Sequence, residues 1–181
     1  MKTFGKVLVA ILIILFTALL YLFVRTYQDV KYSEKYIDFV TNSANNILSE
    51  VEKINVDLNA LEYDETDSDL TSLQSGLEEL KNLSKDVRDE DEEYKEIYSA
   101  NGVNEGLNEF LTRTDSLISS LEVLLNSMEN LEKKDDFDKK LETYIDESDS
   151  LEIESADLQI ELNTYVDNYS KFDVDRILNE I

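Results

Sequence analysis

The chain has 181 residues, of which 41 are acidic and 17 are basic, so its formal net charge at pH 7 is −24. It contains no His, Cys, Pro or Trp and only four Gly. These absences exclude disulfides, thiolate or imidazole metal ligands and cysteine or histidine catalysis, and the negative charge disfavours nucleic acid as a partner. The scarcity of helix breakers favours long helices.

An apolar run occupies residues 7–24, VLVAILIILFTALLYLFV, and contains no charged residue. As a helix it would be roughly 27 Å long, close to the hydrocarbon thickness of about 30 Å. Lys2 and Lys6 precede it, as in a secretory signal, but no small-x-small cleavage site follows. The sequence therefore predicts a single-pass signal anchor at 7–24, after a short cytoplasmic segment at 1–6. A cleaved signal peptide is the alternative.

Basic residues flank this run on both sides. Lys2 and Lys6 lie before it, and Arg25, Lys31 and Lys35 follow it. Basic residues in short flanks set membrane orientation, and with the amino terminus included the two sides balance. The closer packing of positive charge before the run favours an N-terminus inside the cell and an extracytoplasmic bulk of the chain. The reversed orientation is the alternative.

Apolar residues after the run recur at alternating spacings of three and four, the period of helices that each bury one stripe. The pattern predicts helices at about 26–62, 68–99, 104–133 and 136–172. The links between them are short and carry Asp, Asn and Gly, which end helices and cap new ones. The first stripe consists of Ile37, Val40, Ala44, Ile47, Val51, Ile54, Leu58 and Leu61.

Four helices joined by short links become antiparallel neighbours. The fold class that follows is all-α: an N-terminal transmembrane helix that continues into a coiled-coil-like, up-down-up-down four-helix bundle over residues 25–172. The third helix carries a broader stripe than the others, as expected for a helix with two neighbours. After residue 172 the apolar register changes, which predicts an amphipathic tail at 173–181 that leaves the bundle or contacts the stem or a membrane partner.

The distal tip is the end of the predicted bundle that lies farthest from the membrane. At about the same distance from this tip, a small or polar residue interrupts the stripe of each helix: Ala44, Ser84, Thr114 and Ser155. Such a layer leaves space for a small polar ligand or buried waters. The alternative is structural, because small residues let helices approach and hydroxyls bond back to helix carbonyls. The layer is therefore a candidate ligand-binding site.

Two further groups of charged residues stand out. Lys133, Lys134, Lys139 and Lys140 are concentrated at the predicted distal tip, where a negatively charged partner would dock, although Asp residues among them also suit a capped turn. Asp91 occupies a stripe position on the second helix. We expect Asp91 to face solvent near a register slip, because an unpaired buried carboxylate is costly.

These patterns predict a non-enzymatic, acidic structural or protein-interaction module at the cell envelope. Its partners would be the lipid bilayer, through 7–24, and another protein or further copies of itself; no cofactor, metal or nucleic acid is expected. The alternative is an extracytoplasmic sensory or ligand-binding domain that works with a separate membrane partner. The predicted architecture resembles the input domains of chemoreceptors and histidine kinases, but those receptors have a second span and a signalling output, which this sequence does not show.

Overall fold

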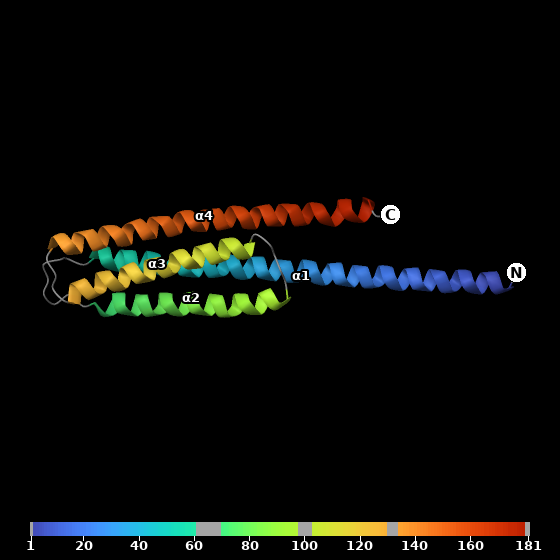
Figure 1. The fold of residues 1–181 in the computed structure, drawn as a ribbon, viewed down its shortest axis with the longest axis horizontal. Coiled ribbons are helices and arrows are strands. Elements are labelled where there is room, and N and C mark those ends of the chain that lie inside the picture. The colour runs from blue at the N-terminus through green and yellow to red at the C-terminus, as the bar shows by residue number, and fades with distance from the viewer. Residues whose placement is uncertain (1, 61–69, 98–102, 130–133, 180–181) are drawn as a thin grey trace. The chain divides into compact units, whose positions relative to one another are not determined.

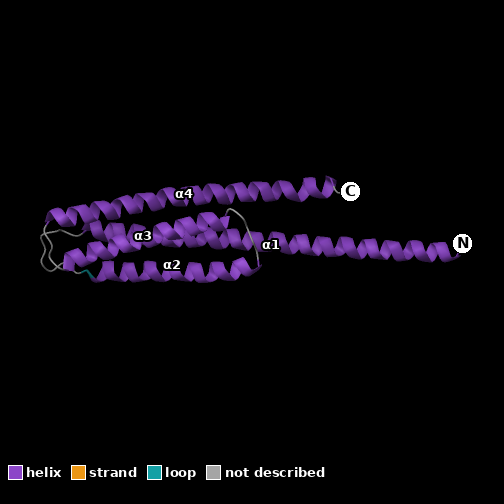
Figure 2. Cartoon of the chain, in the orientation of Figure 1, coloured by secondary structure: helices purple, strands orange, loops and turns teal. Residues whose placement is uncertain are grey.

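The computed structural model describes residues 2–60, 70–97, 103–129 and 134–179. Within these ranges all regular structure is helical, with α1 at Lys2–Ala60, α2 at Thr71–Ile97, α3 at Val103–Glu129 and α4 at Lys134–Asn179 (Figures 1 and 2). The predicted all-α class is confirmed. The chain divides into two compact units, 1–38 and 39–181, and each is described by itself.

The core of residues 39–181 is built from the stripes that the spacing predicts. Burial of apolar surface stabilises by roughly 25 cal/mol per Å², so these stripes supply the main driving force for packing. The broad stripe of α3 is buried on two adjoining rows, as expected for a helix between two neighbours. The fully buried members with the largest side chains are Ile47, Ile54, Leu73, Leu80, Leu107, Phe110, Leu111, Leu117, Leu121, Leu124 and Tyr144.

α1 and α2 pack in antiparallel directions. At one end, the rings of Phe39 and Tyr94 stack with their centroids 5.0 Å apart. Towards the other end, Gly76 lies against Ile54. From the first contact to the second, the residue number increases on α1, from 39 to 54, and decreases on α2, from 94 to 76, so the two helices run in opposite directions. Gly76 permits this close approach because it has no Cβ.

α2 and α3 are also antiparallel, and polar side chains join their outer edges. Gln74 donates a hydrogen bond to Glu129 over 2.7 Å. Further along, Lys81 Nζ lies 2.7 Å from a carboxylate oxygen of Glu122. Solvent-exposed pairs of this kind contribute at most about 1 kcal/mol each, so they adjust the register rather than drive the packing.

α4 contacts both α3 and α1. Gly106 of α3 lies beneath Leu158 and Glu161 of α4, and the Tyr144 hydroxyl of α4 reaches Asn55 of α1. Each helix in residues 39–181 thus contacts its neighbours in sequence, and the last contacts the first. The result is a helical bundle.

The helix boundaries differ from the predicted ones by a few residues, except at the C-terminus. α4 continues to Asn179, through most of the predicted tail at 173–181, because a helical backbone can continue after its apolar stripe changes register. Residues 180–181, and the link at 61–69, lie outside the described residues.

Within the residues that the structure describes, no helix is both long and apolar enough to cross a membrane. Residues 2–14 belong to α1, but their side chains lie outside that description. The predicted span at 7–24 therefore falls partly outside it.

Gly76 and Gly106 provide a matched pair of substitutions. A Cβ added at Gly76 would lie 2.8 Å from Cγ1 of Ile54, which is buried and branched and has little freedom to move. A Cβ at Gly106 would meet the carboxylate end of Glu161, which is exposed and can turn towards solvent, and would lie 3.2 Å from Cδ1 of Leu158, at the far end of that side chain. We expect Gly76→Ala to destabilise by about 1–2 kcal/mol in spite of the better helix propensity of Ala. Gly106→Ala should be neutral or stabilise by up to about 1 kcal/mol.

Urea unfolding followed by circular dichroism at 222 nm measures both changes. Equal effects of the two substitutions would show that the α1–α2 contact is looser than the structure indicates.

Candidate functional site

The structure describes all four residues of the predicted small and polar layer. Ala44, Ser84 and Thr114 are buried, and Ser155 is half-buried. The Ser84 hydroxyl is 3.2 Å from a carboxylate oxygen of Asp115, which places it beside Thr114. Arg113 of α3 and Glu154 of α4 form an ion pair. These two residues directly precede Thr114 and Ser155 in the sequence, so Ser155 lies near the level of Thr114.

Two hydroxyls of this layer are engaged within the protein. Thr114 donates to the carbonyl oxygen of Phe110 over 3.0 Å, the back-bond to the preceding turn that helical Thr commonly makes. Ser84 donates to Asp115, which also accepts a 2.6 Å hydrogen bond from Arg88. These bonds satisfy the hydroxyls without a ligand. The use of the layer as a ligand site stays a prediction.

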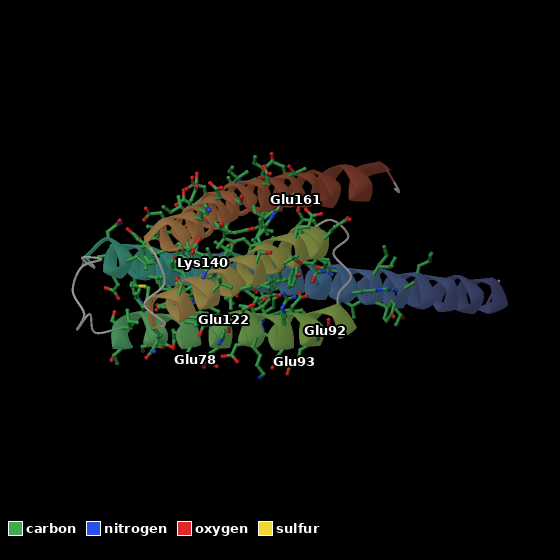
Figure 3. The ribbon with its side chains drawn as sticks, turned by 60° about the vertical axis from the view of Figure 1, so that its left-hand side comes forward. Glu78, Glu92, Glu93, Glu122, Lys140 and Glu161 are labelled. Atoms are coloured by element: carbon green, nitrogen blue, oxygen red, sulfur yellow. The ribbon has the colours of Figure 1, made fainter. Side chains whose placement is uncertain are left out.

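The structure describes the side chains of two of the four predicted tip lysines. Lys133 lies outside the described residues, and Lys134 begins α4 but its side chain is not described. Lys139 is exposed and Lys140 is half-buried (Figure 3). The proposed docking of a negatively charged partner at this tip stays a prediction.

Asp91 differs from the expectation. It is only 2% exposed, so the prediction that it faces solvent is wrong. The reason is that α2 keeps its register: Ser84, Val87 and Asp91 are spaced by three and four residues and all three are buried. The assumed register slip does not occur before this point of α2.

A partly buried polar network that the sequence did not indicate joins α1 to α4. The Tyr144 hydroxyl donates to Oδ1 of Asn55 over 2.9 Å, and Nδ2 of Asn55 donates to the Ser148 hydroxyl over 3.2 Å. The Tyr144 hydroxyl is a donor because it is protonated at neutral pH, and burial raises its pKa further above the ordinary value. Tyr144 and Ser148 occupy stripe positions in the sequence, but Asn55 stands beside the stripe and gives no signal of its own.

Carboxylates gather where α3 and α4 meet. Glu105 and Glu109 of α3 lie near Glu154, Asp157 and Glu161 of α4. Partial burial, followed by repulsion from Glu109, raises the pKa of Glu154. The same two causes, in the same order, raise the pKa of Glu161. The interface between these helices therefore favours protonated carboxyls.

One basic side chain approaches this group. Nε of Arg113 lies 4.0 Å from a carboxylate oxygen of Glu154, and this charge partly opposes the rise in the pKa of Glu154. Arg113 is itself half exposed, so water screens its effect. Repulsion among the acids is therefore only partly compensated.

Comparison of the chain with protein-family models, with curated proteins and with solved structures found no match. Functional interpretation therefore depends on the chemistry of the residues themselves. Across the part of the chain that the structure describes, no three acidic side chains are grouped so that they could hold a metal ion.

The network at Tyr144 is testable by substitution. Tyr144→Phe removes the donor and leaves the Asn55 carbonyl oxygen without its hydrogen bond, so we expect a loss of about 1–2 kcal/mol in unfolding free energy. Asn55→Ala should cost a similar amount. In the double variant the two losses should fall short of their sum by at least about 0.5 kcal/mol, because the residues share one hydrogen bond. Additive losses in urea unfolding would contradict the network.

The acidic group between α3 and α4 predicts a dependence of stability on pH. Groups whose folded-state pKa is raised stabilise the fold fully below their ordinary pKa, which is 4.5 for Glu, and lose that contribution as pH rises. We therefore expect the thermal midpoint to rise as pH falls from 7 towards 5.

The double variant Glu154→Gln/Glu161→Gln should be more stable than the parent at pH 7 and should show a shallower dependence on pH. The matched control is Glu79→Gln/Glu93→Gln, which removes two exposed acids from α2. Equal pH slopes for the two double variants, measured by thermal scans, would show that the α3–α4 group is not responsible.

Proposed function

We propose that this protein is a non-catalytic structural or protein-interaction module at the cell envelope. In this proposal residues 7–24 span the membrane once, and an up-down-up-down four-helix bundle follows on the extracytoplasmic side. The acidic bundle serves as a spacer or scaffold that presents its surface to a protein partner.

The observation that carries the proposal is a set of large apolar side chains exposed in the first unit. Between residues 15 and 24, eight such side chains are 46% to 70% exposed. Proteins rarely leave a continuous apolar surface in water, and such surfaces mark membrane or protein contacts. The set is Leu15, Phe16, Leu19, Leu20, Tyr21, Leu22, Phe23 and Val24.

The sequence before these residues supports a lipid environment over a protein contact. The apolar run begins at residue 7 and contains no charge up to residue 24, so every face of a helix there would be apolar. A helix that packs against one protein partner needs only one apolar face. The membrane is therefore the proposed environment.

The interaction role follows from what the bundle offers. A chain without His or Cys lacks the commonest general base and the thiolate nucleophile, and the hydroxyls of Ser84 and Thr114 are occupied by internal hydrogen bonds. These bonds also give the sensory alternative no specific support. The chain, in contrast, has a large excess of negative charge that a basic partner can complement.

Fractionation tests the membrane anchor. We expect the full chain to stay in the membrane pellet after extraction with alkaline carbonate. Leu15→Arg/Leu19→Arg should release it, because each Arg near the centre of a span costs about 2.5–3.5 kcal/mol. The matched control is Val56→Arg/Val123→Arg, which changes two exposed apolar residues of the bundle and should leave the protein in the pellet. Release of the unaltered chain by carbonate would refute the anchor.

Labelling of intact cells with a membrane-impermeant amine reagent tests the orientation. Lys53, Lys85 and Lys139 are exposed and should react in intact cells if the bundle is extracytoplasmic. Labelling only after lysis would place the bundle in the cytoplasm.

A further inference from the structure

The outer face of α4 carries large apolar side chains that are exposed to solvent. Ile145, Ile153 and Ile160 are 48%, 65% and 62% exposed. Their spacings of eight and seven residues place them on one side of the helix, and exposed Ala156 lies between the last two. The opposite side holds the buried residues Tyr144, Ser148, Leu151, Leu158 and Leu162. α4 therefore has one apolar stripe towards the core and a second, narrower one towards solvent.

The charge around this outer stripe is entirely negative. Between residues 141 and 170 the chain contains no Lys and no Arg. Asp149 lies in line with the stripe, between Ile145 and Ile153, and is itself exposed. The exposed acids that accompany the stripe between residues 142 and 157 are Glu142, Asp146, Asp149, Glu152 and Asp157, whereas Glu154 lies at the α3–α4 interface beside Arg113.

The other helices of the bundle balance their charge differently. On α2, Lys81 pairs with Glu78 and Glu122, and Lys85 pairs with Asp89. Arg88 of α2 pairs with Asp115 of α3. Cations from α2 thus neutralise carboxylates on two helices. Residues 141–170 of α4, in contrast, contain acids but no Lys or Arg.

We propose that the outer face of α4, defined by Ile145, Asp149, Ile153, Ala156 and Ile160, binds a basic amphipathic helix of a partner protein. Apolar side chains of that helix would cover the isoleucines, and its flanking Lys or Arg residues would pair with the surrounding carboxylates. A basic residue at the level of Asp149 would fix the register, as single polar positions do in coiled coils. This inference rests on the proposed interaction function and names the surface and the partner chemistry.

Charge excludes the other occupants. A second copy of this chain would bring two all-acidic faces together, and anionic lipid or nucleic acid would be repelled in the same way. A neutral apolar helix would bury the carboxylates that flank the stripe without pairing them, which costs free energy. A basic helix satisfies both the apolar stripe and the carboxylates.

A synthetic peptide tests the proposal with the full chain held in phosphatidylcholine nanodiscs. The probe is a fluorescent 21-residue helix with one leucine stripe flanked by lysines, and the control peptide has the same composition in scrambled order. We expect fluorescence anisotropy to show binding of the probe at least about tenfold tighter than binding of the scrambled peptide, a difference of about 1.4 kcal/mol. Empty nanodiscs supply the background.

Variants place the binding on α4. Ile153→Ser/Ile160→Ser should weaken binding of the probe by about tenfold or more, whereas Val56→Ser/Val123→Ser, at exposed positions of α1 and α3, should change it less than about twofold. Asp149→Asn/Glu152→Gln should also weaken binding and reduce its dependence on salt. The same changes on α2, Glu79→Gln/Glu93→Gln (Glu93 is labelled in Figure 3), should have a smaller effect. Circular dichroism confirms that each variant is folded.

Three results would overturn the proposal. Equal binding of the scrambled peptide would reduce it to general attraction by an acidic surface. Unchanged binding by both α4 variants would place the site elsewhere. A dimer in analytical ultracentrifugation that Ile153→Ser/Ile160→Ser dissociates would identify a second copy as the occupant. Because the peptide assay reads α4 and carbonate extraction reads residues 7–24, failure of one leaves the other intact.

Discussion

Burial of one apolar stripe per helix is the interaction on which the rest of this structure depends. The chain carries a net charge of −24, and repulsion between like charges opposes every compact arrangement of it. No disulfide holds the fold together, because the chain contains no Cys. The packed seams therefore have to outweigh both the repulsion and the conformational entropy of the chain. The width of the apolar stripe on α3 contributes to this, because α3 buries two adjoining rows of residues and contacts helices on both sides.

Polar contacts set the details of packing around these seams. Ion pairs of Lys81 and Arg88 align α2 with α3 at the surface, whereas a partly buried network aligns α1 with α4 through Asn55 and Tyr144. The two kinds of contact differ in their sensitivity to salt: exposed ion pairs are screened, and hydrogen bonds between neutral groups depend little on salt. The alignment of α1 with α4 therefore depends less on ionic strength than the alignment of α2 with α3.

The periodicity of apolar residues in the sequence was sufficient to predict the helices and the faces that they bury. The stripe residues of α2, from Leu73 to Asp91, are all buried at the predicted spacing. The error at Asp91 arose because its polarity was given more weight than its register. Asn55 was missed for a related reason: hydrogen bonds across a bundle depend on the rotation and level of two helices, which a one-dimensional spacing does not contain. For the same reason, the hydrogen bonds that occupy Ser84 and Thr114 could not be predicted by counting along the helices.

Cations are distributed unequally around the bundle, which makes its sides electrostatically different. Lys81, Lys85 and Arg88 lie on α2, while the stretch of α4 from residue 141 to 170 carries only acids among its charged residues. Residues 71–97 and residues 141–170 each contain nine acids, but four cations stand among those of α2 and none among those of the α4 stretch. The net negative charge is therefore larger along this stretch of α4 than along α2. A neighbouring positively charged surface attracts α4 more strongly and turns the bundle about its long axis until α4 faces that surface.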